Sequence, residues 1–174
     1  RILNRCMDSD ATEDELAVVR GGLYHEDSFV RLAALEAAGR SGDSTLIERA
    51  VDATRDTDMD RRHAAARGLS FGLSPEHRKV LPDLMQAFDL ANARRLAVVT
   101  DDTVRIEAYL VRAIRRFVEA GGFGTTQAQE VALMALDSSL QHKPLVVTAL
   151  ELLDLTTPEE GLSADRRWDP ELSR

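Results

Sequence analysis

The sequence predicts an all-α protein, an α-solenoid in which about four helical hairpins wind into a right-handed superhelix. The first observation is a segment, DSFVRLAALEAAG, that starts at Asp27 and has the composition of a short alanine-rich helix. Its pattern returns 31 and 74 residues later, at Asp58 and Asp101. Paired helices that recur roughly every 30–45 residues are typical of α-solenoids. The second observation is the low aromatic content of 5%, which suits close packing between helices better than a β-sandwich.

The first hairpin is expected to begin at Thr12, where the sequence TEDE forms a capping box and places acidic side chains at the positive end of a helix. Gly21 and Gly22 end this helix. The second helix of the hairpin follows, with Asp27 or Ser28 as its N-cap. Helical spacing predicts that one continuous apolar stripe of this helix is buried. The stripe is formed by Val30, Ala33, Ala34, Ala37 and Ala38.

The second repeat carries the same signals and an additional segment. Asp58 opens the second copy, and the interval from Asp58 to Asp101 is 12 residues longer than the first interval. The extra length predicts an insertion around residues 70–100. Within it, the sequence SPE from Ser74 is a helix start, and Pro82 should kink or split the helix that follows.

Residues 1–155 are therefore assigned to one repeat domain. The last predicted helix, PLVVTALELLDL from Pro144, is apolar on nearly all sides, unlike a helix with a solvated face. Such a helix needs cover from a further repeat, a partner or the chain itself. We expect the C-terminal tail at 156–174, which carries Trp168, to pack back over this helix.

Charge and composition argue against several classes of protein. The net charge of −8 disfavours a general binder of nucleic acid or anionic membranes, although residues 61–120 contain 11 basic and 7 acidic residues. The single cysteine, Cys6, excludes an intramolecular disulfide and a cysteine-based zinc site, and it indicates a cytoplasmic location. No apolar run approaches the ~18 residues of a membrane span. Because the first residue is Arg1 instead of Met, the chain is expected to be a segment of a larger protein.

Three patterns that could carry chemistry have simpler structural interpretations. The sequence GLSFG from Gly68 matches the nucleophile elbow of α/β-hydrolases, but a predicted helix precedes it where the elbow needs a strand. The sequence DTDMD from Asp56 opens like an EF-hand loop, but Arg61 and Arg67 occupy the positions of its glycine and final glutamate. The four histidines lack the close spacing of metal ligands. The sequence therefore predicts a non-enzymatic protein without a metal or cofactor.

The repeated segments resemble the HEAT-like repeats of phycobilin lyases and of many bacterial scaffold proteins. The resemblance is carried by Asp27, Val30-Arg31 and Ala33-Ala34 in the first copy, by Asp58, Arg62 and Ala64-Ala65 in the second, and by Asp101, Val104-Arg105 and Ala108 in the third. The second copy departs from the family at Arg61, where the family has valine, and the fourth copy lacks both the Asp and the Arg. By this resemblance, the repeated arginines form a ladder in which each arginine pairs with the aspartate of an adjacent repeat.

The candidate partner-binding residues are the arginines that such a ladder does not use. They are Arg94, Arg95, Arg112, Arg115 and Arg116. Arg112 and Arg116 follow Arg105 by 7 and 11 residues and therefore share a helical stripe with it. These side chains predict a basic patch for an acidic partner, a phosphate or a nucleic-acid backbone; a merely solvated face is the competing interpretation.

We expect a protein-interaction scaffold that binds a protein partner through the face lined by the second helices of the repeats. The alternative is a binder of nucleic acid or a phosphate ligand, similar to HEAT-like DNA glycosylases, which need a basic concave face and aromatic residues for a displaced base. The net charge and the single Trp168, outside the repeats, disfavour that alternative. A bilin-lyase-like chaperone is a further alternative by the resemblance in fold alone.

Overall fold

The computed structural model describes residues 11–119, 125–137 and 142–156, and all regular structure in these ranges is helical. The elements are α1 (Glu13–Gly22), α2 (Ser28–Arg40), α3 (Ser44–Ala53), α4 (Met59–Gly72), the 3₁₀ helix η1 (Pro75–Val80), α5 (Leu81–Ala97), α6 (Asp101–Glu119), α7 (Thr125–Asp137) and α8 (Lys143–Thr156). The predicted all-α class is confirmed.

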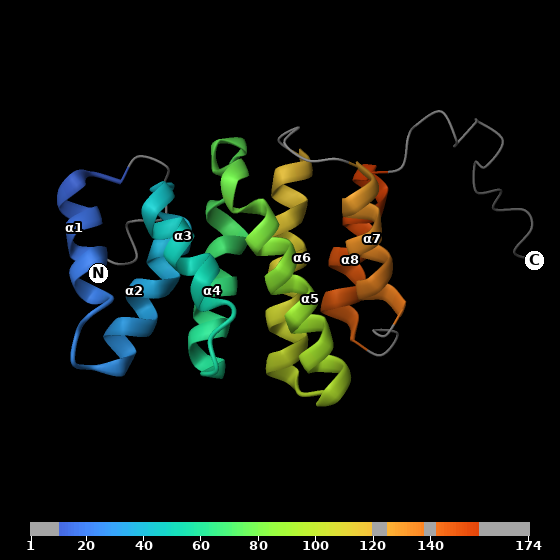
Figure 1. Ribbon diagram of the computed structural model, residues 1–174, viewed down its shortest axis with the longest axis horizontal. Coiled ribbons are helices and arrows are strands. Elements are labelled where there is room, and N and C mark those ends of the chain that lie inside the picture. The colour runs from blue at the N-terminus through green and yellow to red at the C-terminus, as the bar shows by residue number, and fades with distance from the viewer. Residues whose placement is uncertain (1–10, 120–124, 138–141, 157–174) are drawn as a thin grey trace, which may run out of the picture.

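The helices form two rows (Figure 1). α2, α4, α6 and α8 pack against one another in that order. α3 contacts α5 and α5 contacts α7 in the second row, and α1 contacts α2. The even-numbered helices are those that the sequence places second in each repeat. The turns α1–α2, α3–α4 and α5–α6 all lie at one edge of the molecule, the lower edge in Figure 1.

One apolar core runs from α2 to α8 and includes residues from every helix between them. Large side chains without exposed surface include Leu69 on α4, Phe88 on α5, and Leu110 and Phe117 on α6. A smaller cluster around Val19 joins α1 to α2 and α3. Each hairpin therefore shields apolar surface of the next one, and none of them buries its own apolar side alone.

Helix starts follow the predicted capping signals. The hydroxyl oxygen of Thr12 accepts a hydrogen bond from the N–H of Glu15 (3.4 Å), and the N–H of Thr12 donates to the Glu15 carboxylate (2.9 Å), which completes the capping box. Asp27, Asp43 and Asp58 are the N-caps of α2, α3 and α4. The aspartate that opens each of the first two repeat segments therefore fixes where its helix begins.

The predicted insertion contains η1 and α5. Pro82 is the second residue of α5, and the chain is split just before it, at the junction with η1. This agrees with the missing N–H of proline, which is tolerated in the first turn of a helix but not in its interior. The extra residues lengthen α5 to 17 residues, compared with 10 in α1 and in α3.

The buried side of α2 differs from the predicted stripe. Ala33 is exposed, whereas Leu35, which the stripe omits, is buried. α2 contacts α1, α3 and α4, so its buried arc extends to both sides of Ala34 and Ala38 and leaves Ala33 in solvent. A stripe drawn for one neighbour is too narrow for a helix that has three.

α8 is covered on one side by its neighbours. Leu145, Ala149 and Leu152 are buried against α6 and α7, whereas Val147 and Leu150 are exposed. The prediction that the tail with Trp168 covers α8 falls on residues outside the described ranges. Cys6 also lies outside these ranges.

α2 and α4 approach each other closely through glycines. A Cβ atom on Gly68 would lie 2.3 Å from the carbonyl oxygen of Glu36, and a Cβ atom on Gly39 would lie 2.6 Å from the backbone nitrogen of Leu69. Such contacts involve backbone atoms, so no side-chain movement can relieve them. Gly39 on α2 and Gly68 on α4 are therefore both required for this helix packing.

We predict that Gly68→Ala destabilises the protein, because the added methyl group must displace the backbone of α2. Overpacking of this kind costs about 1–3 kcal/mol and should lower the Tm measured by circular dichroism. Gly21→Ala is the matched control, since a Cβ atom there meets nothing within 4 Å and alanine is the better helix former. A Tm for Gly68→Ala at or above the wild-type value would contradict the close contact.

Candidate functional site

One stripe of exposed and partly exposed side chains from each of α2, α4, α6 and α8 contributes to a surface that we call the even-helix face. Each of these helices packs against its neighbours and leaves one stripe to solvent. The stripes contain Glu36 and Arg40 on α2, His63, Arg67 and Phe71 on α4, Arg105, Tyr109, Arg112 and Arg116 on α6, and Val147, Leu150 and Glu151 on α8. The sequence predicts binding through this face.

Charges at the α2–α4 end of the even-helix face are paired. The Glu36 carboxylate accepts a hydrogen bond from Arg40 Nη2 (2.6 Å) and lies 3.5 Å from Arg67 Nε. The Arg40 guanidinium also stacks over the ring of Phe71, 4.4 Å from its centroid. One carboxylate and one aromatic ring therefore hold two arginines at this end of the face.

His63 and Tyr109 join α4 to α6 on the same face, with ring centroids 5.5 Å apart in an edge-to-face arrangement. His63 Nε2 is buried and has no hydrogen-bond partner among the described residues. Burial lowers the pKa of His63 from its usual 6.5, and the positive charges of Arg67 and Arg105 act in the same direction, against the charge of Asp102. His63 is therefore held in its neutral form.

Three arginines on α6, which we call the arginine stripe, are exposed. They are Arg105, Arg112 and Arg116, and none of them makes a hydrogen bond or ion pair with another described residue. Arg115 differs, because it pairs with a glutamate of its own helix at 2.8 Å and with Glu151 on α8. Of the five predicted partner-binding arginines, Arg112 and Arg116 are thus the two on α6 with free guanidinium groups.

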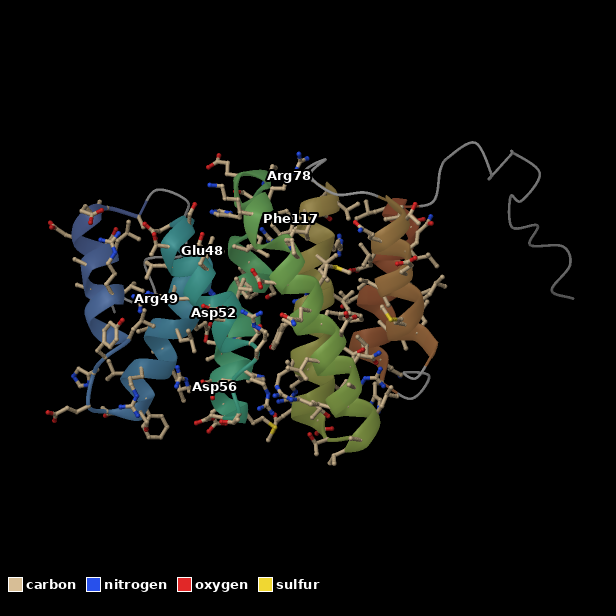
Figure 2. All side chains as sticks on the ribbon, in the orientation of Figure 1. Glu48, Arg49, Asp52, Asp56, Arg78 and Phe117 are labelled. Atoms are coloured by element: carbon tan, nitrogen blue, oxygen red, sulfur yellow. The ribbon has the colours of Figure 1, made fainter. Side chains whose placement is uncertain are left out.

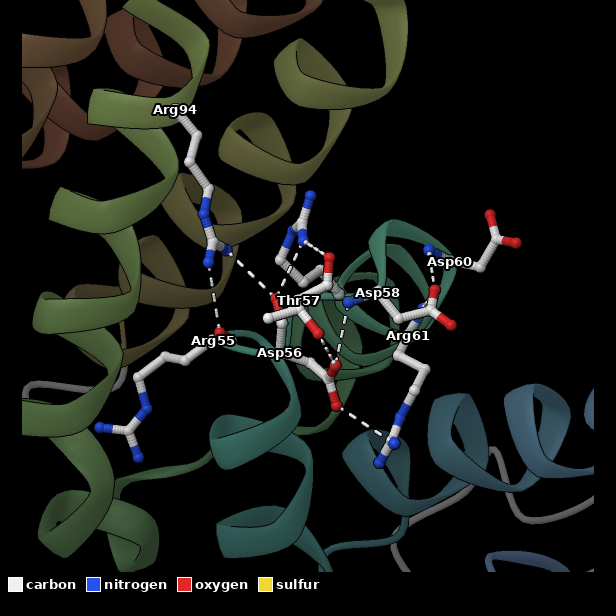
Figure 3. Close-up of polar contacts among 8 residues, drawn as sticks. Arg55, Asp56, Thr57, Asp58, Asp60, Arg61 and Arg94 are labelled. Atoms are coloured by element: carbon white, nitrogen blue, oxygen red, sulfur yellow. Dashed lines mark hydrogen bonds and ion pairs between the residues drawn. The ribbon is translucent and has the colours of Figure 1, made fainter. Parts of the chain in front are cut away.

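The prediction that Arg95 belongs to a surface patch is wrong. Its side chain is 1% exposed, and it makes a two-pronged ion pair with the buried carboxylate of Glu107, with Nη2 3.0 Å from Oε1. Burial raises the pKa of Glu107, against the attraction of the Arg95 charge. Arg94 is half-buried and donates to the backbone carbonyls of Arg55 and Asp56 (3.4 Å each), which ties α5 to the α3–α4 turn (Figure 3).

The predicted ladder of arginines and aspartates is also wrong. Arg31 Nη1 donates to the backbone carbonyls of His25 and Glu26 (2.7 and 2.6 Å). Arg62 Nη1 makes the equivalent bonds to the two corresponding carbonyls of the α3–α4 turn, those of Asp56 and Thr57 (2.9 and 2.7 Å). Asp27 and Asp58 are already occupied as N-caps, whereas turn carbonyls outside a helix need donors. In the third copy Arg105 makes no such bonds. The hydroxyl of Thr103 instead lies within hydrogen-bond distance of the backbone carbonyls of Val98 (3.2 Å) and Thr100 (2.9 Å) in the α5–α6 turn.

A groove that the sequence analysis missed lies between α1, α2, α3 and the start of α4. It encloses about 590 Å³. Its floor is apolar and consists of Leu23, Leu32, Leu35 and Ala53. Phe29 and Tyr24 stand at its rim, 80% and 72% exposed, and Figure 2 shows Arg49, Asp52 and Asp56 one below another along α3 and the turn after it. The available signal was a pair of aromatic residues in a charged turn, YHEDSF, in a chain with few aromatics.

The arginines that line the groove all have partners. Arg31 donates to carbonyls of the α1–α2 turn. Arg49 Nη1 donates to the hydroxyl of Tyr24, and its guanidinium lies 5.6 Å from the centroid of that ring. Arg61 Nη1 lies 3.2 Å from a carboxylate oxygen of Asp56. Each guanidinium group of the groove therefore has a partner within the chain, and among the described residues only the partner of Arg61 is a carboxylate.

Two aspartates of the groove, Asp58 and Asp60, have carboxylate oxygens without a partner among the described residues. Asp56 accepts from the N–H of Asp58 (2.9 Å) and pairs with Arg61, and these contacts lower its pKa, the backbone bond most of all. Asp58 uses one carboxylate oxygen as the helix cap, and its other oxygen makes no bond with the described chain. The carboxylate of Asp60 makes none either. With Asp52, the lining contains four aspartates against three arginines, so acidic residues are in excess at the rim.

The described residues do not assemble a metal-binding group of three or more His, Cys, Asp or Glu side chains, and none of their helices is long and apolar enough to span a membrane. Ser70, the serine of the G-x-S-x-G match, is buried in α4 and donates to the carbonyl of Arg67 (2.7 Å). This segment is a helix that packs on α2, and it lacks the strand-to-helix turn that exposes a nucleophile.

We predict that Arg95→Met lowers stability by about 3–5 kcal/mol, because it leaves the Glu107 carboxylate buried without its partner. Urea unfolding measures the loss. The double variant Arg95→Met/Glu107→Leu should recover most of it, since an apolar pair can replace a buried ion pair. If Arg95→Met is as stable as wild type, Arg95 is not the buried partner of Glu107.

We predict that His63→Gln reduces the loss of stability on acidification. Because the folded-state pKa lies below the unfolded value of about 6.5, the unfolded chain binds protons first as the pH falls, and this part of the stability is lost below about pH 6.5. Tm measured between about pH 7.5 and 5.5 should therefore vary less in His63→Gln than in wild type. The same substitution at the exposed His25 is the control, and an unaltered pH profile in His63→Gln would contradict the assignment.

Comparison of the sequence with models of protein families gave no match, and comparisons with curated proteins and with solved structures gave none either.

Proposed function

We propose that the chain is a HEAT-like solenoid, that it acts as a non-enzymatic protein-interaction scaffold, and that its even-helix face binds an acidic protein segment. The observation that carries the proposal is the arginine stripe. Its three exposed guanidinium groups lack a carboxylate partner among the described residues, although Arg40 and Arg115 on the same face are paired. Three cations on one helix, all on its exposed side and unpaired within the described part of the chain, are matched to an anionic partner.

The spacing of the arginine stripe suits an extended acidic segment. Arg105 and Arg116 are 11 residues apart, which corresponds to roughly 16 Å along a helix. Guanidinium groups bind carboxylates through two parallel hydrogen bonds, and arginine is enriched at protein interfaces. Solenoids provide long continuous surfaces of this kind.

Phosphate groups would meet the same guanidinium groups, so a nucleic acid is the competing partner. Two features favour a protein. The net charge of −8 opposes a polyanion at long range, and Tyr109, the aromatic residue of the α6 stripe, packs against His63, so that its ring is not free to stack on a base.

We predict that Arg112→Glu/Arg116→Glu reduces partner capture about tenfold or more, because each substitution turns an attraction into a repulsion. Affinity capture from the native source, quantified by mass spectrometry, would identify the partner, and binding of the purified partner would then be measured directly. Arg78→Glu/Lys79→Glu on η1 is the matched control, since both side chains are exposed outside the even-helix face.

Two results would contradict the proposal. One is equal capture by the α6 variant and the η1 control. The other is tight binding of a DNA or RNA 20-mer at low salt that weakens steeply as salt rises, which is the behaviour of a phosphate-backbone site.

A further inference from the structure

We propose that the groove between α1, α2, α3 and the start of α4 is a second binding site, for a peptide segment that inserts an apolar side chain and carries lysine or arginine next to it. This site shares no residue with the arginine stripe. Its test is therefore independent of the proposed function of the even-helix face.

The groove has a rim of exposed aromatic residues above an apolar floor. Phe29 is the second residue of α2 and is 80% exposed; it precedes Leu32 and Leu35 by three and six residues on the same helix. Tyr24 is 72% exposed, and the guanidinium of Arg49 lies over its ring. Arg49 holds the Tyr24 ring in place through its hydroxyl. An apolar side chain in the groove would cover the floor and the inner side of both rings, and removal of that area from water would drive binding.

The rim of the groove has more acidic than basic residues, with four aspartates against three arginines. The three arginines of the groove are engaged by turn carbonyls, by Tyr24 and by Asp56. The carboxylate of Asp60 and one oxygen of Asp58 are free. A cation beside the apolar anchor would meet these oxygens, whereas an anion would meet guanidinium groups that already have partners.

The shape favours a chain segment over a compact polar molecule. About 590 Å³ is room for on the order of twenty water molecules at ~30 Å³ each. Small polar ligands are usually fixed by buried polar groups, whereas the buried residues that line this groove, Leu35 and Ala53, are apolar. The groove is lined by residues of the α1–α2 and α3–α4 turns, which lie with the α5–α6 turn at the lower edge in Figure 1, and Met59, Val98 and Val99 are exposed in or beside these turns. A bound segment can continue along this edge.

Four fluorescein-labelled nonapeptides test the proposal with the 174-residue chain. All share a Gly/Ser framework, and they combine a central Leu or Ser with flanking Lys or Glu residues. Fluorescence anisotropy should show that the Leu/Lys peptide binds at least about tenfold more tightly than the other three. Equal binding of all four peptides, or no binding of the Leu/Lys peptide, would overturn the proposal.

Matched variants locate the site. Phe29→Ser should abolish binding of the Leu/Lys peptide, whereas Phe71→Ser, the same change at an exposed phenylalanine on the even-helix face, should leave it unchanged. Asp60→Lys should shift the preference toward the Leu/Glu peptide, and Asp89→Lys, at an exposed aspartate of α5, should not. Because the Asp60 variant is expected to gain a ligand, a loss of folding cannot mimic its result. Equal effects of the groove and control variants would place binding elsewhere.

Discussion

The close approach of α2 and α4 at Gly39 and Gly68 is the constraint on which both candidate surfaces depend. It brings the carbonyl of Glu36 within reach of α4, and the side chain of that glutamate then pairs with Arg67 on the even-helix face. The same two helices supply much of the groove, since its floor includes Leu32 and Leu35 of α2 and its acidic rim is the first turn of α4. A wider spacing between these helices would separate the parts of both surfaces.

Arginine has three different roles in this chain, and the environment of each side chain decides which one it takes. Arg95 is buried in an ion pair with Glu107. Arg31 and Arg62 satisfy backbone carbonyls in turns. The arginine stripe faces solvent, and its charge remains available to a partner. A count of basic residues in the middle of the chain adds these roles together, although only the last one leaves a guanidinium group without a partner among the described residues.

Local signals in the sequence predicted the helix starts at Thr12 and Asp58 and the split before Pro82, because capping and the missing N–H of proline act within one turn of the chain. The depth of Arg95 could not be predicted in this way, since its partner Glu107 belongs to the next helix and both are buried only when α5 packs on α6. The groove was missed for a related reason. Four elements build it, and their lining residues, from Leu23 to Arg61, are spread over the first third of the sequence.

The bonds of Arg31 and Arg62 have a consequence for how such a chain can change its length. Each guanidinium reaches only five or six residues back, to the turn that precedes its own helix. The reinforcement of a turn is therefore contained within one hairpin and needs no matching residue in the next. A duplicated or deleted hairpin would carry its own turn support with it, so that growth or shortening by whole units would leave the remaining turns intact.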